Sequence, residues 1–515
     1  MRLRRRRFAF PVRGLIAAGI LALAVLGACG GGDGEDASSG SQKLETNGRP
    51  VILISIDSLR ADHCTPYGYK AQFTDLDTTP FMARLAAEGV LFENAQSVTS
   101  WTLPSHLSLL TGMDTYEHGV RHREFRLKLG TENLASRLQR AGYQTGGVYT
   151  APFLHPQWGY GKAFGFDFYK GASAYLEDLR ATEIIKDTAT KQALMKLHNQ
   201  AHVDAECSGR AIDIAIDWLS QENRHQKPFF LFLHLWDPHY DYDPPDDLRE
   251  AFHPGYDGPI DGSHFIDKGK EYSGADLEHF IALYDAEIRY TDNEIARLFA
   301  QLETWGIADQ VIFAVTSDHG EEFYEHGRKG HQKTLYEEVT HIPMVVRAPG
   351  AVPAGARIPA TVGLYDLAPT LLDLAGVQPW SDRQGKSMLP ILEGHEGDRD
   401  VLMDLYLHTR FGARLMGLRK GKDKVIWNLK GKAGTSPGEY FDLDQDPREK
   451  HPDHFKVTAD HPWGLILDQL MRPKGAFQEI TGATGQAVEM EMSKEMEASL
   501  AGVGYADSES EEEEQ

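Results

Sequence analysis

The chain of 515 residues alternates between two patterns of apolar and polar positions along most of its length. Continuous apolar runs are typical of strands buried on both faces of a sheet, and apolar residues at helical spacing predict helices between them. The runs expected to form strands are 51–56, 146–149, 229–235, 311–316 and 343–347, and the expected helices are 79–88, 132–141, 201–221, 275–304 and 365–374. This alternation predicts an α/β fold with a large, mostly parallel sheet sandwiched by helices.

The pattern changes after about residue 395, where apolar and polar residues alternate in short runs. Runs of this kind at 401–407, 413–420, 424–430 and 439–443 predict a smaller antiparallel sheet, and 462–471 has helical spacing. We therefore expect a main domain over 49–395 and a C-terminal α+β subdomain over 396–473. The remainder, 474–515, ends in DSESEEEEQ and is expected to be a weakly ordered acidic tail.

The first 28 residues have the features of a signal peptide, because basic residues from Arg2 to Arg7 precede an apolar stretch too short to span a bilayer comfortably. The following LGAC at 26–29 resembles a bacterial lipobox, so Cys29 is the expected site of lipidation. Residues 29–48 are rich in Gly, Ser and acidic residues and predict a flexible tether. An ordinary cleaved signal and a twin-arginine signal are the alternatives. The prediction is an exported lipoprotein of the bacterial cell envelope, held at the membrane only by its lipid anchor.

Composition narrows the possible functions. The chain carries 53 Lys and Arg against 76 Asp and Glu, a formal net charge of −23, so no nucleic-acid partner is expected. Hydrophobic residues make up 41%, which is enough to form a core and excludes disorder of the whole chain. Apart from Cys29 only Cys64 and Cys207 remain, and the sequence leaves open whether they pair.

Residues of catalytic type follow three of the predicted strands. Asp57, Asp237 and the pair Asp318-His319 each come at the end of an apolar run. Because the carboxyl ends of parallel strands meet at one edge of a sheet, these side chains are expected to converge there. A hydroxyl is offered by Thr102, which lies two residues before a proline suited to the first turn of a helix. The free N–H groups of that turn favour an anion beside the hydroxyl.

This set of residues suits metal-assisted ester chemistry. Two carboxylates, one imidazole and one hydroxyl match the preferences of a divalent cation with an open coordination position. Such a cation would lower the pKa of the Thr102 hydroxyl and make it a nucleophile near neutral pH. The structural alternatives are that Asp57 caps the following turn and that Thr102 is a helix N-cap.

Several ordered segments resemble the sulfatase family of the alkaline phosphatase superfamily, over about residues 50–454. The family signature C-x-P-S-R-x-x-x-L-T-G is matched by TLPSHLSLLTG at 102–112. Further matching segments are PHYDYDPP at 238–245, GHQK at 330–333 with LYEEVTHIP at 335–343, DLAPTLLDLAGV at 366–377 and YFDLDQDPRE at 440–449. The resemblance implies an alkaline phosphatase-like fold for the main domain.

Site roles carried over from the resemblance extend the set. Asp57, Thr102, Asp318 and His319 would hold one divalent metal, with Thr102 also the nucleophile. The residues implied to hold the anionic oxygens of the substrate or to protonate its leaving group are His239, Lys333 and His331. Structural alternatives are a packed loop histidine at 239 and a solvated lysine at 333. A second metal held by Asp237, His239 and His331 is a further possibility, not supported by any Asp-x-x-x-His spacing.

The sequence also departs from the family pattern. Sulfatases use a cysteine oxidised to formylglycine, whose second hydroxyl expels sulfate, whereas Thr102 offers one hydroxyl and no formylglycine. The family's arginine is replaced by His106 and its second aspartate by Ser58, and the Gly-Lys-x-His segment is missing after 142–145. Fewer carboxylates make calcium less suited than Mn, Zn or Mg.

These departures predict a metal-dependent, sulfatase-like hydrolase that cleaves phosphate mono- or diesters or phosphonates through Thr102. The alternatives are a sulfuric ester hydrolase, a transferase that passes a phospho-substituent to a lipid or glycan, and an inactive sulfatase-like binding protein. The expected substrate is a small molecule or a glycan or lipid ester. The sequence leaves its organic part and the oligomeric state open.

Overall fold

The computed structural model describes residues 46–172, 207–267, 269–406, 414–429, 437–456, 458, 461–471 and 487–489. These residues all belong to one unit of the chain, Gln42–Gln515. The leader, the expected lipidation site Cys29 and most of the acidic tail lie outside the described residues.

An eight-stranded sheet forms the centre of the fold, in the order β11-β2-β10-β7-β1-β6-β4-β5. The five strands expected from apolar runs are β1 (Val51–Ile56), β4 (Gln144–Tyr149), β6 (Phe229–Leu235), β7 (Ile312–Ser317) and β10 (Met344–Arg347). The pattern did not indicate β2 (Val90–Gln96), β5 (Phe168–Gly171) or β11 (Ala356–Gly363). Within this sheet β10 runs antiparallel to both neighbours, and the other pairings are parallel. The prediction of a large, mostly parallel sheet is confirmed.

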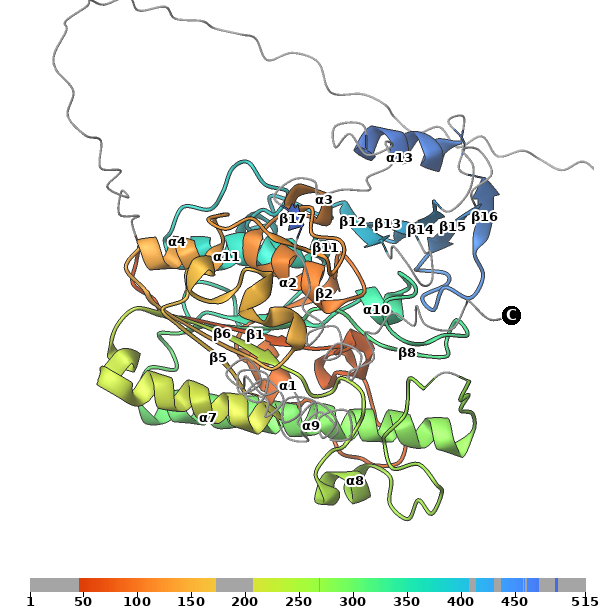
Figure 1. Cartoon of the computed structure of the whole chain (residues 1–515), viewed down its shortest axis with the longest axis horizontal. Helices are drawn as coiled ribbons and strands as arrows, with labels where there is room; N and C mark the ends of the chain where they lie inside the picture. The colour runs from red at the N-terminus through yellow and green to blue at the C-terminus, as the bar shows by residue number, and fades with distance from the viewer. Residues whose placement is uncertain are drawn as a thin grey trace, which may run out of the picture. The chain divides into compact units, whose positions relative to one another are not determined.

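Helices cover both faces of the sheet (Figure 1). One layer contains α2 (Thr102–Thr111), α4 (Leu134–Arg140) and α11 (Leu367–Leu374), and the other contains α1 (Pro80–Glu88), α7 (Cys207–Ser220) and α9 (Ala275–Thr304). Shorter helices are α3 (Thr115–His118), α8 (Asp246–Phe252), α10 (Glu337–Thr340) and α12 (Leu389–Leu392). The sandwich follows from strands that are apolar on both sides.

Side chains of each strand alternate between the two helix layers, as the period of two requires. In β1, Val51 and Leu53 pack in the cluster that contains the α2 and α4 leucines, whereas Ile52 and Ile54 pack in the cluster of α7 and α9. In β6, Phe232 likewise lies on the α2 side. Two positions further along these strands, the polar residues Ser55 and His234 therefore face α2. The candidate site lies on this side of the sheet.

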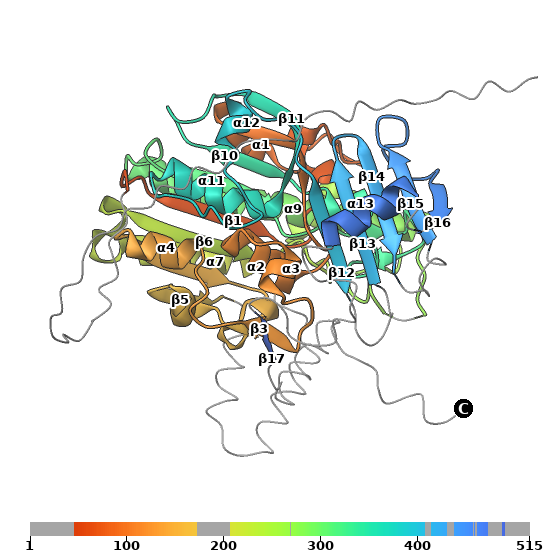
Figure 2. The ribbon, with the colours of Figure 1, turned by 90° about the horizontal axis from the view of Figure 1, so that it is seen from above.

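The C-terminal part forms a five-stranded antiparallel sheet in the order β12-β13-β14-β15-β16, beside the main sheet (Figure 2). Its strands are β12 (Val401–Tyr406), β13 (Arg414–Lys420), β14 (Asp423–Asn428), β15 (Pro437–Asp442) and β16 (Asp453–Lys456), and α13 (Pro462–Met471) follows. A buried ion pair connects the segment after α3 with β12 of this sheet, with Arg121 Nη2 2.6 Å from Asp404 Oδ1. The predicted smaller antiparallel sheet with a following helix is confirmed.

Short elements complete the described residues. Two small ladders pair β3 (Phe125–Leu127) with β17 (Ala487–Glu489), and β8 (Glu322–Phe323) with β9 (Lys329–Gly330). Single 3₁₀ segments lie at Ala61–His63, Thr65–Tyr67, Pro152–Leu154, Pro156–Trp158, Gly161–Phe164, Gln221–Gln226 and Leu364–Asp366. None of the helices described here is long and apolar enough to cross a membrane. Cys64 and Cys207 are both buried free thiols.

Candidate active site

The four residues predicted to hold a metal come together at one point. Ligand atoms of Asp57, Asp318 and His319 all lie within 4.8 Å of one another. His319 Nε2 is 3.4 Å from Thr102 Oγ1, 3.7 Å from Asp57 Oδ1 and 3.4 Å from Asp318 Oδ2. All four side chains are fully buried. Four positions spread over more than 200 residues of sequence thus share one site.

Strand pairing explains why the two carboxylates meet. β1 and β7 are parallel neighbours, and Ile56 of β1 pairs with Ser317 of β7. The next residue on each strand is Asp57 or Asp318, so the two carboxylates leave the same sheet edge side by side. Thr102 is the first residue of α2, which packs on this sheet. The free backbone N–H groups and the dipole of that helix end favour negative charge beside its hydroxyl.

Hydrogen bonds from the surrounding backbone fix which atoms face the site. Ser58 has φ 56°, and its N–H donates to Asp318 Oδ1 at 3.2 Å, as does the N–H of His319 at 2.8 Å. Asp318 Oδ2 has no hydrogen-bond partner among the described residues. His319 Nδ1 lies 2.9 Å from the carbonyl of Gly320, so Nδ1 carries the hydrogen and the lone pair of Nε2 faces the carboxylates.

These residues fit a divalent cation. A fully buried carboxylate oxygen without a hydrogen-bond partner is costly, and metal coordination would satisfy it. Burial, together with the neighbouring charge of Asp57, raises the pKa of Asp318, which a cation at this position would reverse. The carboxylate and hydroxyl oxygens are ligands that Mg and Mn prefer, and the imidazole is a ligand that Zn prefers.

The predicted substrate-contacting residues border this group. The ring of His331 lies 4.5 Å from that of His319 and 5.0 Å from that of His239, between ring centroids. His331 Nδ1 is 3.1 Å from the buried Glu321 Oε1. Burial lowers the pKa of Lys333, and the negative charges of Glu322 and Glu321 oppose this shift. The structure places the ring of His331 beside that of His319 and the ring of His239 beside that of His331. The catalytic roles of His239, His331 and Lys333 stay predictions.

Asp237 lies apart from the ligand groups. Its Oδ2 accepts from the N–H of Ser208 at 2.9 Å, and Cys207 Sγ lies 3.7 Å from the same carboxylate. Among the residues that the structure describes, Asp237 is in neither group that could hold a metal. A second metal held by Asp237, His239 and His331 is therefore not supported.

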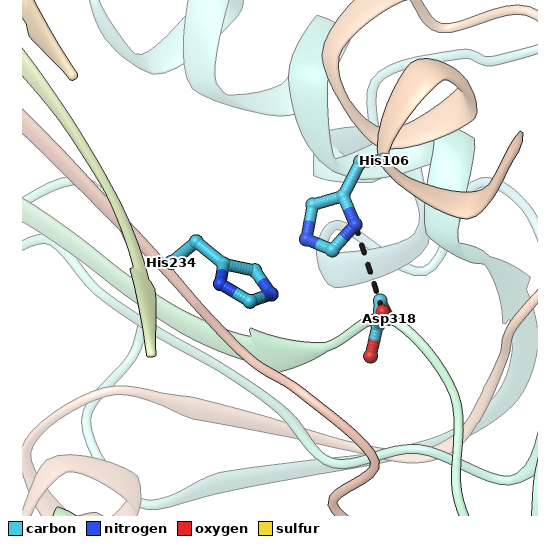
Figure 3. A group of neighbouring side chains, drawn as sticks. All are labelled: His106, His234 and Asp318. Atoms are coloured by element: carbon cyan, nitrogen blue, oxygen red, sulfur yellow. Dashed lines mark ion pairs between the residues drawn. The ribbon is translucent and has the colours of Figure 1, made fainter. Parts of the chain in front are cut away.

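Two histidines next to the ligands were not assigned a role from the sequence. His106 of α2 and His234 of β6 form a second group with Asp318, so Asp318 belongs to both (Figure 3). Burial lowers the pKa of His106 to about 3 and that of His234 to about 4, so both rings are neutral at neutral pH. The signal for His234 was present in the sequence, because it is the polar position in the apolar run FFLFLHL.

The fold and the site together define the class of protein. A hydroxyl at a helix N-terminus beside two carboxylates and an imidazole suits ester hydrolysis, and the matching families and relatives are hydrolases that act on ester bonds, within the alkaline phosphatase-like superfamily. The family model described as "Sulfatase" matches residues 49–377, and the model "N-sulphoglucosamine sulphohydrolase, C-terminal" matches residues 325–461. The chain belongs to the sulfatase family.

Relatives of known name agree with this assignment. The chain is 27% identical over 474 residues to an N-acetylglucosamine-6-O-sulfatase of Bacteroides thetaiotaomicron, covering 79% of this chain and 83% of the relative. It is 26% identical over 489 residues to an arylsulfatase of Clostridium perfringens, covering 82% and 94%. The crystal structure of a phosphonate monoester hydrolase of Agrobacterium radiobacter has the same fold, with a TM-score of 0.60, 21% identity, and coverage of 86% and 100%.

Proposed function

We propose that this sulfatase-family hydrolase cleaves phosphorus esters, either phosphate mono- or diesters or phosphonates, with Thr102 as the nucleophile. The observation that carries the proposal is the side chain at position 102, whose single hydroxyl oxygen lies 3.4 Å from His319 Nε2 beside two carboxylates. A formylglycine hydrate has a second hydroxyl that expels sulfate, and threonine has none. A threonyl ester is cleared only by attack at its central atom, which is far easier at phosphorus than at a sulfate ester.

The reaction runs in two displacements on this arrangement. A bond forms between Thr102 Oγ1 and phosphorus while the bond from phosphorus to the leaving oxygen breaks, and the hydroxyl proton passes to water. The leaving oxygen takes a proton from the side chain of His239, His331 or Lys333. Water then attacks the phosphothreonine at phosphorus and restores the Thr102 hydroxyl, so the net reaction is hydrolysis of one ester bond. Bound divalent cation supplies the Lewis acidity that makes a threonine hydroxyl reactive near neutral pH.

Sulfate-ester hydrolysis is the second candidate. It is favoured by the names of the relatives, which include an N-acetylglucosamine-6-O-sulfatase and an arylsulfatase at 26 to 27% identity. By the same reasoning the substrate of this chain would be a small molecule or a glycan ester. Transfer of a phospho-substituent to a lipid or glycan, and an inactive binding protein, remain the other two readings of the site.

One panel of assays separates these functions. The purified protein, supplied with Mn²⁺ or Zn²⁺, is offered nitrophenyl phosphate, a phosphodiester, a phosphonate and a nitrophenyl sulfate. The proposal expects turnover of one or more phosphorus substrates, loss of that rate in Thr102→Ala and on chelation, and a phosphorylated Thr102 peptide after acid quench. Faster turnover of sulfate than of every phosphorus substrate would refute the substrate assignment. Product found on an added acceptor, instead of free phosphate, would establish transfer.

We also propose that the protein is tethered to the bacterial envelope through lipidated Cys29. The support is the order of the basic run, the apolar run and the LGAC segment at 26–29. Mass spectrometry of the N-terminal peptide from the native source checks this. A diacylglyceryl-modified Cys29 as first residue is expected, and an unmodified cysteine or cleavage elsewhere contradicts it.

A further inference from the structure

A buried polar layer lies where α2 meets the sheet, and it shares Asp318 with the candidate ligand group (Figure 3). It contains His106 and His234, whose ring centroids are 4.8 Å apart, and Asp318, whose Oδ2 is 3.6 Å from His106 Nδ1. All three side chains are fully buried. Two imidazoles and a carboxylate have the composition of a second metal site, so the orientation of the rings decides what the group does.

The hydrogen bonds of His106 direct a protonated ring nitrogen, Nδ1, toward Asp318, and a protonated nitrogen does not bind a metal. His106 Nδ1 is 2.9 Å from the backbone carbonyl of Thr102, which only accepts, so Nδ1 carries the hydrogen. The lone pair is then on Nε2, which lies 3.0 Å from the hydroxyl of Ser55. The nitrogen nearest to Asp318 is therefore a donor and offers no lone pair to a cation.

His234 shows the same arrangement on the other side. Its Nε2 lies 3.2 Å from Asp57 Oδ2, and an ionised carboxylate only accepts, so Nε2 carries the hydrogen. Its Nδ1 lies 2.8 Å from the hydroxyl of Thr150, which follows β4 and also lies 3.0 Å from the backbone carbonyl of His234. A chain of hydrogen bonds thus runs from Thr150 through His234 to Asp57, across three neighbouring strands.

We propose that His106 and His234 are positioning residues that orient Thr102 and Asp57 through hydrogen bonds, and that they do not form a second metal site. The Thr102 carbonyl and the Asp57 carboxylate accept one N–H from each ring, so the rings direct these N–H groups at the nucleophile's backbone and at the candidate ligand carboxylate. The family's arginine at position 106 would bring a fixed charge into this fully buried layer, whereas the imidazole has one N–H directed at the Thr102 carbonyl. The inference rests on the proposed function for the identity of the nucleophile and the metal ligands.

The experiment measures Mn²⁺ affinity, kcat and KM of the full-length protein with substitutions at position 234. His234→Leu removes the N–H that faces Asp57, whereas His234→Gln places an amide N–H at similar reach. Loss of an outer hydrogen bond to a metal ligand costs on the order of 10- to 100-fold in metal affinity, so we expect that loss in His234→Leu and recovery of most of it in His234→Gln. The expected effect on kcat is of similar size, with KM for the substrate changed by less than about threefold, because neither histidine is placed to touch the substrate.

His118 offers a matched control. It is a fully buried histidine whose ring is also held by hydrogen bonds, from the N–H of Val120 to Nδ1 at 3.0 Å and between Nε2 and Ser108 Oγ at 3.1 Å. His118→Gln is expected to leave Mn²⁺ affinity unchanged. Thr150→Val removes the hydroxyl that contacts both the ring Nδ1 and the backbone carbonyl of His234 and keeps the ring itself. It provides the test if His234→Leu does not fold, with an expected loss of affinity of several-fold.

Metal content distinguishes the remaining outcomes. Atomic emission of the Mn²⁺-saturated protein is expected to give one ion per chain, and two ions per chain, falling to one in His234→Leu, would overturn the proposal. Unchanged affinity and kcat in both His234→Leu and Thr150→Val would also overturn it. If no phosphorus ester is turned over but affinity still falls in His234→Leu and recovers in His234→Gln, the proposed function fails and the positioning role stands.

Discussion

Asp318→Asn should stabilise the metal-free protein and at the same time abolish its response to metal. In the structure Asp318 Oδ1 accepts two backbone N–H groups, while Oδ2 is buried without a hydrogen-bond partner among the described residues. Leaving such a group unsatisfied costs about 1–3 kcal/mol, and more when it is charged. An asparagine keeps the accepting oxygen and replaces the orphan oxygen by an N–H₂ that can donate to Asp57 Oδ1 or His319 Nε2. The variant should therefore gain about 1–3 kcal/mol in chelator.

Metal reverses this order. A ligand that binds only the folded state adds about 2.7 kcal/mol of stability at a free concentration 100 times its dissociation constant. The parent protein should gain that amount on addition of Mn²⁺, and Asp318→Asn, which lacks one anionic ligand, should gain close to none. The assay is urea unfolding followed by tryptophan fluorescence, with EDTA and with Mn²⁺.

Asp237→Asn is the matched control. Asp237 is a buried aspartate that follows β6, is satisfied by the N–H of Ser208 and lies outside the ligand groups. Its substitution is expected to destabilise equally with and without metal. Two results would refute the reasoning that this carboxylate is a metal ligand. One is a lower free energy of unfolding for Asp318→Asn than for the parent protein in EDTA, and the other is a stabilisation by Mn²⁺ as large as that of the parent.

Three further outcomes follow from other parts of the structure. Burial lowers the pKa of His118 to about 3, so below about pH 6.5 the unfolded state binds one more proton than the folded state, and the free energy of unfolding falls by about 1.4 kcal/mol per pH unit. His118→Gln should remove this share of the pH dependence, as measured by urea unfolding at pH 6 and pH 4.5. The same pH dependence in the parent and the variant would contradict the prediction. A Cβ on Gly320 would lie 2.1 Å from the carbonyl of Glu338, so Gly320→Ala should shift the backbone next to the ligands and weaken Mn²⁺ binding by on the order of tenfold, as read by titration calorimetry. Arg121→Met leaves the buried Asp404 without its ion-pair partner and should lower the free energy of unfolding in urea by about 3–5 kcal/mol. Adding Asp404→Leu should recover most of that loss. Additive effects of the two substitutions would count against a buried pair.

Much of the architecture was predictable because its signals are local. The helix expected at 275–304 is α9 (Ala275–Thr304), and the strand expected at 229–235 is β6 (Phe229–Leu235). The missed strands have mixed patterns for a physical reason. β11 is an edge strand that contains a proline and is half exposed over its first residues, and β2 carries two partly exposed polar residues in its middle. Neither is buried on both faces along its length, so neither has a continuous apolar run.

The candidate site divides in the same way. The sequence by itself determined the polar residues at the ends of buried strands, Asp57 and Asp318-His319, and the single hydroxyl at Thr102 on which the choice of phosphorus depends. Only the tertiary structure decided that β6 and β4 follow β1 in the sheet, which brings His234 to Asp57. The period of side chains along a strand is set locally by the backbone, whereas strand order depends on pairings between segments far apart in the chain. For that reason the candidate ligands could be proposed from the sequence, and the hydrogen bonds around them could not.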